Sequence, residues 1–356
     1  MTNSDASLRA ALPLAITMGD PCGIGPEIIV KAFALDAQAT QGTFVVGDVG
    51  VLQRAAALLP EAKRCALVEI SQPAQALGLS PHTLPVLQAF PALPQLPWGQ
   101  IHPVAGQAAG DAVFWAARAA LQGRVSAIVT APLHKEALSA AGAPYDRFPG
   151  HTELLQAESA AFLHKNSQDV PVRMMLANDE LRTVLVSIHV SLRQAIEAVT
   201  LANVLQTIVI THQALSAMLG RAPRIAVAGL NPHAGEGGLF GSEEVAIIAP
   251  AVQQAKALGM DVQGPFAPDT VFMRARHRAS SPGEFDVVVA MYHDQGLIPV
   301  KYLGVEKGVN VTLGLPLVRT SPDHGTAMDI AGQGVADASS LLEAIRMART
   351  LVARRA

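Results

Sequence analysis

Cysteine is scarce in this chain: Cys22 and Cys65 are the only two among 356 residues. Two cysteines cannot build the disulfide framework of a small secreted domain, and these two lack the close spacing of a metal-binding pair. A reducing compartment is therefore expected.

An excess of charge of one sign is missing too, because the formal net charge is only −3 at pH 7. The sequence also has no cluster of Lys and Arg interleaved with aromatic residues. A strongly basic surface is the usual mark of a protein that binds a polyanion. Nucleic acid is therefore not an expected partner.

Long apolar runs are absent as well. The apolar stretch 199–210 is interrupted by Asn203, Gln206 and Thr207, and it falls short of the ~20 residues that a membrane span needs. Residues 1–20 lack the basic start and the long apolar centre of a signal peptide. We therefore expect a cytoplasmic protein without membrane contact.

Aromatic residues make up only 4% of the chain, whereas hydrophobic residues make up 50%, so the expected core is aliphatic. Short aliphatic runs of strand length alternate with longer segments of helical spacing, which predicts parallel βαβ units. The expected strands are 13–17, 43–48, 65–70, 126–132, 173–177, 182–189, 224–232, 285–294 and 308–314, and the expected helices are 109–124, 151–163, 191–209 and 242–259.

Two segments depart from this alternation. The runs 173–177 and 182–189 are separated by only a few polar residues and predict an antiparallel hairpin, a feature that often marks a second domain. The proline-rich segment 80–100 is expected to be an irregular surface connection. The length of the chain suits either two domains or one large α/β unit.

Three predicted strands carry a histidine at or just beyond their carboxyl end: His189, His233 and His293. Ligands of open parallel sheets bind beyond the carboxyl ends of the strands. One such histidine is most simply a core or surface residue, but three at separate strand ends predict a site for a divalent metal. After His293, Gly296 is expected to allow a sharp turn that points Lys301 back into the same site.

The glycine-rich turns do not fit the common phosphate-binding patterns. In "GDPCGIGPEI" the third glycine of G-x-G-x-x-G is replaced by Ile28, and in "HAGEGGLFGSEE" the last glycine is replaced by Phe240. Tight strand-to-helix turns are sufficient to explain these glycines. No G-x-S-x-G elbow is present either, so a serine nucleophile is not expected.

Seven motifs resemble, in the same order, the 4-hydroxythreonine-4-phosphate dehydrogenase family of pyridoxal phosphate biosynthesis. They lie at residues 16–28, 129–138, 148–155, 229–238, 264–270, 291–302 and 309–334. The last includes "DHGTAMDIAGQG", which also resembles the adenine-binding loop of isocitrate and isopropylmalate dehydrogenases.

The resemblance implies an isocitrate/isopropylmalate dehydrogenase-like α/β fold with two domains and an active-site cleft between them. The first domain is expected to comprise residues 1–135 and 310–356, and the second domain residues 136–309. Within the second domain, the segment 273–285, which precedes the expected strand 285–294, looks longer than the family pattern. It is expected to be a surface loop whose His277 is not a metal ligand.

The family also implies a set of site residues. One divalent metal, which is zinc, magnesium or cobalt in different members, is expected on histidines from both subunits of a homodimer. The implied metal ligands are His189, His233 and His293; the substrate contacts are His151, Thr152, Lys301, Asn310 and Arg319; and the nucleotide contacts are His324, Gly325, Thr326 and Ala327. Asp269 is expected near the metal, where a carboxylate can orient its ligands. Lys301 also suits proton transfer.

The implied substrate is a phosphorylated hydroxy amino acid, 4-phosphooxy-L-threonine. NAD or NADP oxidises its 3-hydroxyl, and the resulting β-keto acid loses carbon dioxide to give 3-amino-2-oxopropyl phosphate. Relatives that act on 4-phospho-threonate, 4-phospho-erythronate or a cis-dihydrodiol dicarboxylate remain alternatives. A further alternative is a non-redox acyl-transfer or binding protein on the same fold.

Overall fold

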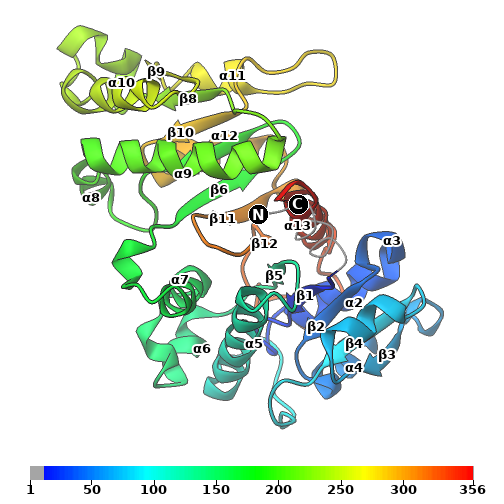
Figure 1. Ribbon diagram of the computed structural model, residues 1–356. Coiled ribbons are helices and arrows are strands. Elements are labelled where there is room, and N and C mark those ends of the chain that lie inside the picture. The colour runs from blue at the N-terminus through cyan, green and yellow to red at the C-terminus, as the bar shows by residue number, and fades with distance from the viewer. Residues whose placement is uncertain (1–11, 356) are drawn as a thin grey trace. The chain divides into compact units, whose positions relative to one another are not determined.

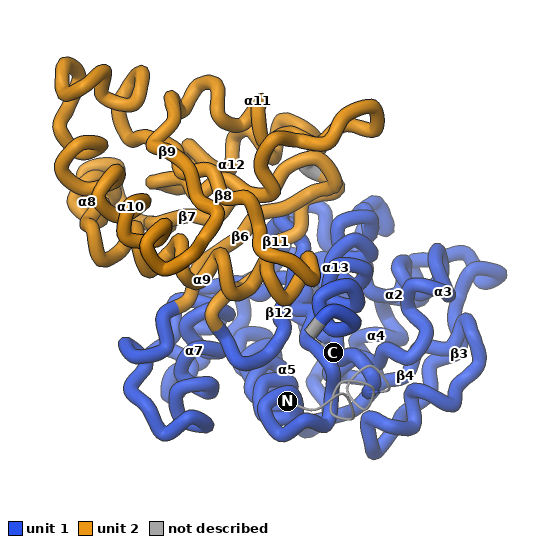
Figure 2. The backbone as a smooth tube through the Cα atoms, turned by 45° about the horizontal axis from the view of Figure 1, so that its top comes forward, with its two compact units in different colours: residues 1–171, 315–356 blue, residues 172–314 orange. Residues whose placement is uncertain are grey.

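The computed structural model describes residues 12–355 and divides the chain into two compact α/β units. Unit 1 contains the described residues up to 171 and from 315 onward, and unit 2 contains residues 172–314 (Figure 2). The absence of a signal peptide was expected from residues 1–20. Of these, residues 1–11 lie outside the described residues. Between residues 12 and 355, no helix combines the length and the apolar character that a membrane crossing needs.

Unit 1 is built on a parallel sheet whose strands follow the order β3-β4-β2-β1-β5-β12. The strands are β1 (Leu14–Thr17), β2 (Thr43–Val46), β3 (Ala66–Glu69), β4 (Thr83–Leu87), β5 (Ile128–Thr130) and β12 (Arg319–Pro322). The α-helices are α2 (Gly25–Leu35), α3 (Ala37–Thr40), α4 (Val49–Ala56), α5 (Pro103–Leu121), α6 (Lys135–Ala140), α7 (His151–Phe162) and α13 (Ser339–Arg355). Short 3-10 turns are η1 (Glu61–Lys63), η2 (Pro73–Gly78), η3 (Tyr145–Arg147) and η4 (Ser167–Asp169).

Unit 2 has a mixed sheet in the order β11-β6-β7-β10-β8-β9 (Figure 1). The strands are β6 (Arg173–Ala177), β7 (Arg182–Leu185), β8 (Ile225–Ala228), β9 (Val262–Phe266), β10 (Val287–Ala290) and β11 (Val309–Leu313). Its helices are α8 (Leu192–Glu197), α9 (Leu201–Leu219), α10 (Ala249–Ala257), α11 (Val271–Ala275) and α12 (His293–Tyr302), with short turns η5 (Pro232–Gly238), η6 (Glu244–Ile248, π-helical) and η7 (Val305–Lys307).

The strand pattern predicted from aliphatic runs is confirmed, since each expected run contains an observed strand. The hairpin is confirmed as well, because β6 and β7 pair antiparallel with Met175 opposite Val184. Strand β10 is buried along its whole length, as the run of valines indicated. It also lies in the interior of the sheet, because β7 and β8 both pair with it in parallel, one on each side.

Three strands were not predicted from the sequence. Strand β4 lies in the proline-rich segment, where Pro85 cannot donate a ladder hydrogen bond, yet its last four residues are buried in the sheet. Strand β9 contains Gly264 and Pro265, and β12 has the polar sequence RTSP. The expectation of an irregular connection over 80–100 is therefore wrong for 83–87.

The chain after β10 also differs from the expectation. Helix α12 begins at His293, so Gly296 lies inside a helix and not at a sharp turn. A β-carbon on Gly296 would overlap the side chain of Leu185 and lie 3.0 Å from Cβ of Ala290. The glycine therefore serves close packing of α12 on β7 and β10.

Two expected helices are interrupted. The segment 191–209 forms two helices, because Thr200 caps a new one by accepting a hydrogen bond from the amide of Asn203 at 3.2 Å. The segment 242–259 begins with a π-helical turn before α10.

The first boundary between the units lies at 171–172, not near residue 135, and the second lies at 314–315, not at 309–310. The reason is that α6 and α7 pack on α5 of unit 1 (Figure 1). Gly106 permits this packing, because a β-carbon there would overlap the backbone carbonyl of Ala137 in α6.

We expect Gly106→Ala to destabilise the protein by about 1–3 kcal/mol, because overlap with a backbone group outweighs the better helix propensity of alanine. The midpoint of urea-induced unfolding measures the loss. Gly78→Ala is the control, since a β-carbon at Gly78 meets no atom within 4 Å. A Gly106→Ala protein that unfolds at or above the wild-type midpoint would contradict this account of the α5–α6 contact.

Candidate functional site

The three predicted metal ligands follow three neighbouring strands of unit 2. Strands β7, β10 and β8 are parallel, with β10 in the middle, so their carboxyl ends share one edge of the sheet. His189 follows β7, His293 opens α12 after β10, and His233 lies in η5 after β8. All three histidines therefore follow strands that end at the same edge of the sheet.

Two of these histidines lie close together. The ring centroids of His189 and His293 are 5.7 Å apart, with an interplanar angle of 43°. Two imidazoles on one tetrahedral ion, each with a metal–nitrogen distance of about 2 Å, have ring centres roughly 5 Å apart. The pair is therefore compatible with two ligands of one metal ion.

The orientation of His293 is fixed by a carboxylate. Its Nδ1 lies 2.7 Å from Oδ1 of Asp294, which is the arrangement that commonly orients a metal-binding imidazole through its second nitrogen. This contact leaves Nε2 available to a ligand.

The third histidine is separate from the pair. The ring of His233 packs near Phe240, with centroids 6.1 Å apart. Within residues 12–355 no three His, Cys, Asp or Glu side chains form a group that could hold a metal ion. One chain thus brings two of the three predicted ligands together.

The backbone that carries these histidines has an uncommon conformation. His189 has a φ of 22°, and the five residues from His233 to Gly237 all have φ between 43° and 76°. A left-handed conformation costs about 1–2 kcal/mol for each residue other than glycine. Such strain is usually found at functional sites, where the surrounding structure maintains it.

The buried carboxylate of Glu244 lies against this turn. It accepts hydrogen bonds from the amides of Leu230 and Asn231, both at 2.7 Å, and from Nδ2 of Asn231 at 3.0 Å. Burial raises the pKa of Glu244, but the hydrogen bonds from Asn231 and Leu230 outweigh it, so the net pKa is lowered. From the sequence, Glu244 was only one residue of the expected helix 242–259, although an acidic pair directly after a glycine-rich turn was a usable signal.

Lys301 and Asn310 lie away from the histidines within unit 2. Lys301 is eight residues beyond His293 in α12, or about 12 Å along the helix axis. The carbonyl of its neighbour Val300 accepts a hydrogen bond from Asn178, which lies in the turn between β6 and β7. Because that turn precedes β7, it is at the opposite edge of the sheet from the one that carries His293. Gly296 lies inside α12 and does not turn Lys301 back, and the role of Lys301 at the site stays a prediction.

Asn310 is near the start of β11, opposite Leu176 close to the end of β6, so it too lies toward the edge that holds the hairpin turn. Asp269 is exposed and follows β9, whose carboxyl end is at the histidine edge because β9 is parallel to β8.

The predicted substrate contacts of unit 1 centre on a buried cation. Arg319 is 4% exposed, and its Nη2 and Nε donate to Oγ1 of Thr130 at 2.7 and 3.1 Å. Burial lowers the pKa of Arg319 to about 10, and the charge of Glu153 acts in the opposite direction. The guanidinium remains charged at neutral pH, and a buried guanidinium beside a hydroxyl suits a phosphate or carboxylate.

His151 adds a neutral group to this subsite. It opens helix α7, and its Nε2 is shielded from solvent with no hydrogen-bond partner among the described residues. Burial lowers the pKa of His151 well below its usual value, and the charges of Arg319 and Lys135 act in the same direction. A hydrogen bond with the backbone of Ala131 raises the pKa but does not offset these effects. Thr152, the next residue, is half-buried.

The predicted nucleotide loop, residues 323–334, is anchored on the turn before α2. The amide of Ile24 donates to the carbonyl of Thr326 at 3.0 Å, and a β-carbon on Gly23 would lie 2.9 Å from the same oxygen. Ala327 has a φ of 39°. The glycine-rich turn therefore both begins α2 and binds the backbone of this loop, and Gly23 allows the two segments to approach closely.

An ion pair in α2 fixes the far end of the loop. Glu27 accepts hydrogen bonds from the amides of Gly334 and Ala336, at 3.3 and 2.8 Å. Lys31 donates to the carbonyls of the same two residues at 2.8 and 2.6 Å, and it pairs with Glu27 at 2.9 Å. The loop is thus bound through its main chain.

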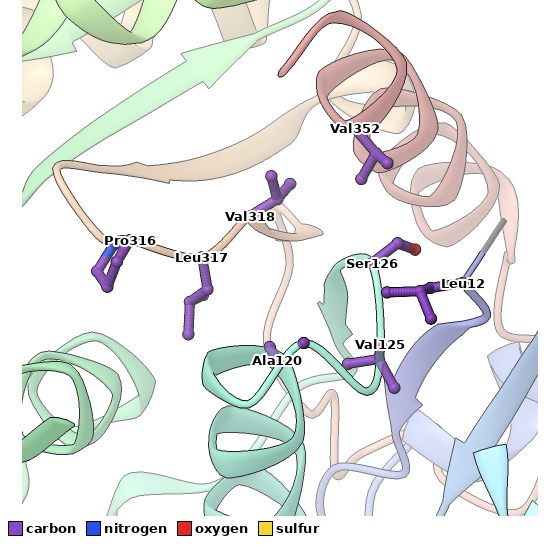
Figure 3. Close-up of a pocket in the computed structure, with 9 residues that line it drawn as sticks. Leu12, Ala120, Val125, Ser126, Pro316, Leu317, Val318 and Val352 are labelled. Atoms are coloured by element: carbon purple, nitrogen blue, oxygen red, sulfur yellow. The ribbon is translucent and has the colours of Figure 1, made fainter. Parts of the chain in front are cut away.

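A small aliphatic pocket of unit 1 is not the site. Its accessible volume is about 30 Å³, which holds one or two water molecules. Figure 3 shows its lining: Leu12, Ala120, Gly123, Val125, Ser126, Pro316, Leu317, Val318 and Val352. None of the predicted site residues is among them.

The lowered pKa of His151 predicts a pH-dependent stability. The ring is neutral in the folded protein but gains a proton in the unfolded chain below pH ~6.5. The unfolded state then binds more protons, so the protein loses stability as the pH is lowered. We expect the wild type to lose about 1 kcal/mol more than His151→Gln between pH 7 and pH 5.5. Urea unfolding of both proteins at the two pH values measures this, and equal losses would show that His151 gains a proton in the folded protein as readily as in the unfolded chain.

Comparison with known proteins gives relatives along nearly the whole chain. The chain is 54% identical over 343 residues to the 4-hydroxythreonine-4-phosphate dehydrogenase of Beijerinckia indica, which covers 95% of each protein. It is 46% identical over 340 residues to the D-threonate 4-phosphate dehydrogenase of Salmonella typhimurium, covering 95% of this chain and 98% of that relative.

Solved structures agree with these relatives. The crystal structure of a 4-hydroxythreonine-4-phosphate dehydrogenase from Klebsiella pneumoniae matches with a TM-score of 0.82 and 42% identity, covering 96% of this chain and 99% of that one. A terephthalate 1,2-cis-dihydrodiol dehydrogenase from Burkholderia xenovorans matches with a TM-score of 0.62 and 32% identity, covering 95% and 98%.

The family model described as "Pyridoxal phosphate biosynthetic protein PdxA" matches residues 39–348. Since this match spans most of the chain and the relatives align along almost their full length, the chain belongs to the PdxA family.

Proposed function

We propose that this chain is a dehydrogenase that uses NAD or NADP to oxidise the 3-hydroxyl of 4-hydroxythreonine 4-phosphate. The main support for this reaction is the 54% identity of the chain to a 4-hydroxythreonine-4-phosphate dehydrogenase. The buried Arg319 beside Thr130 supports an anionic substrate. Relatives above 40% identity carry dehydrogenase names, which favours redox chemistry over acyl transfer.

The substrate would be held by its charged ends. Arg319 offers a fixed guanidinium for the phosphate or the carboxylate, and the neutral His151 and Thr152 offer hydrogen bonds without a second charge. Lys301 and Asn310 complete the proposed set. Their positions toward one edge of the unit 2 sheet, away from the histidines, support a site built from two chains.

A homodimer is therefore part of the proposal. Exposed apolar side chains follow two of the histidine-bearing strands, as expected for a surface that a second copy covers. They are Val190, Leu192 and Ile196 after β7, and Leu239, Phe240 and Val245 after β8. A second copy would also supply the ligand that one chain does not bring to the pair of His189 and His293.

His189, His233 and His293 are the proposed metal ligands, and the spacing of the His189 and His293 rings is compatible with this role. When bound, a divalent cation such as zinc, magnesium or cobalt supplies electrostatic stabilisation of the negative charge that develops on the substrate oxygen. Asp269, near the same sheet edge, is proposed to orient ligands, and Asp294 holds the His293 ring.

In the proposed reaction the hydride leaves C3 for the nicotinamide, and the hydroxyl proton passes to a base. Lys301 is the proposed base. The bond between C2 and the carboxyl carbon of the β-keto acid then breaks, carbon dioxide leaves, and C2 takes up a proton to give 3-amino-2-oxopropyl phosphate. The nucleotide is proposed to lie against His324, Gly325, Thr326 and Ala327, in the loop that α2 anchors.

D-threonate 4-phosphate is the second candidate substrate, because relatives at 45% and 46% identity carry that name. Threonate has a hydroxyl at C2 where hydroxythreonine has an amine, so its decarboxylated product is a hydroxyketone phosphate and not an aminoketone phosphate. The product therefore discriminates between the two.

We expect the purified protein to reduce NAD or NADP with 4-hydroxythreonine 4-phosphate at least tenfold more efficiently, in kcat/KM, than with D-threonate 4-phosphate. Absorbance of the reduced nucleotide and the amine content of the product measure this. Reversal of the preference would assign the second substrate, and inactivity with both would refute the proposal.

The same assay tests the histidines. His233→Ala should lower kcat/KM at least 100-fold and weaken metal binding, while the protein stays folded. His164→Ala, on an exposed histidine of unit 1, is the control. Wild-type turnover by His233→Ala in metal-free buffer would exclude the proposed metal site.

Gly325→Val tests the nucleotide loop. A β-carbon at Gly325 meets no atom of the protein within 4 Å, so the new side chain would obstruct a ligand without disturbing the fold. We expect KM for the nucleotide to rise about tenfold or more with metal affinity unchanged. Gly78→Val, equally open but in η2, is the matched control, and an unaltered KM in Gly325→Val would place the nucleotide elsewhere.

A further inference from the structure

Beyond the histidines themselves, the sheet edge that carries them contains two polar side chains with unusually well-defined partners. Glu244 is 2% exposed and Gln295 is partly buried. Neither was predicted to act at the site. Both bond to backbone groups at the ends of the strands that lead to His233 and His293.

Gln295 connects the ends of β8 and β10. Its Nε2 donates to the carbonyl of Gly229 at 2.8 Å, and its Oε1 accepts from the amide of Met291 at 2.7 Å. Gly229 directly follows β8, and Met291 directly follows β10. The side chain therefore bridges the two strands just where the described sheet register between them ends.

A hydroxyl extends this connection to the third strand. Ser187 Oγ, just beyond β7, donates to the carbonyl of Met291 at 3.0 Å. The three strand ends that precede His189, His293 and His233 are thus joined by side-chain hydrogen bonds.

Glu244 fixes the turn that follows Gly229. Its Oε1 accepts hydrogen bonds from the backbone amides of Leu230 and Asn231, and its Oε2 accepts one from the side-chain amide of Asn231. A β-carbon at Gly235 would lie 2.7 Å from Oε2 of Glu244, and one at Gly229 would lie 3.0 Å from Oε1. The left-handed turn is therefore packed directly around this carboxylate.

We propose that Glu244 and Gln295 are positioning residues of the metal site: Glu244 holds the left-handed turn that carries His233, and Gln295 holds the end of the strand that presents His293. This inference rests on the proposed function, because it assumes that the histidines bind a metal ion. Ligands must stay within about 0.5 Å of their productive positions for tight binding. A strained turn requires such support, because its backbone does not favour the conformation by itself.

The test uses the full-length protein, stripped of metal with a chelator and titrated with cobalt(II). Visible absorption of the bound ion and calorimetry report the dissociation constant. Glu244→Gln and Gln295→Leu should raise it 10- to 100-fold, the usual effect of losing groups that orient metal ligands. Both proteins should keep the wild-type circular dichroism spectrum and a cooperative thermal transition.

Matched controls change the same chemistry elsewhere in unit 2. Asp261→Asn removes a carboxylate charge, and Gln254→Leu removes an amide, both at exposed positions. These variants should bind cobalt within twofold of the wild type. In a His233→Ala background, Glu244→Gln should add less than a twofold change, since Glu244 acts through His233.

Wild-type cobalt affinity in both Glu244→Gln and Gln295→Leu would overturn this inference while leaving the proposed metal site intact. No cobalt binding by the wild type, or binding unaffected by His233→Ala, would remove the metal site and the inference with it. If Gln295→Leu does not fold, Gln295→Glu replaces it, because it keeps the acceptor for Met291 and loses the donor to Gly229.

Discussion

The parallel alignment of β7, β10 and β8 is the constraint on which the site in unit 2 depends. Parallel strands end at the same edge, so residues far apart in sequence leave the sheet side by side. The middle strand, β10, is apolar on both faces and is fully buried. Such a strand lacks the alternation that normally sets its register, because a slip by one residue would bury equally apolar side chains.

Polar side chains at the strand ends provide the missing register. Gln295 donates to the carbonyl of Gly229 beyond β8, and Ser187 beyond β7 donates to the carbonyl of Met291; these bonds between strands would not form if β10 moved by one residue. Packing thus supplies the stability of the sheet, whereas hydrogen bonds at its edge determine where the histidines lie. This division is consistent with the strained backbone at His189 and His233, which packing alone would not maintain.

The sequence was sufficient to predict the α/β class, the hairpin and the placement of three histidines at strand ends, because aliphatic runs and strand-end polarity are local signals. That the three strands are neighbours is shown only by the fold. It did not reveal β12 or β9, whose polar or Gly- and Pro-containing sequences do not resemble buried strands. Helix α12 was missed because Gly296 suggests a turn unless its contact with Leu185 is known. The roles of Gln295 and Glu244 depend on partners that only the fold brings near, such as Gly229, 66 residues before Gln295.

The anchoring of the loop 323–334 has a consequence for how this protein can change. Glu27 and Lys31 hold this end of the loop through main-chain atoms of Gly334 and Ala336, and Ile24 bonds to the main chain of Thr326. These bonds depend on the number of residues between the anchors and not on which side chains they carry. Substitutions between the anchors can therefore accumulate and retune ligand preference, except at Gly332, where a β-carbon would overlap Trp98. An insertion or a deletion of one residue would instead move the two anchors out of step.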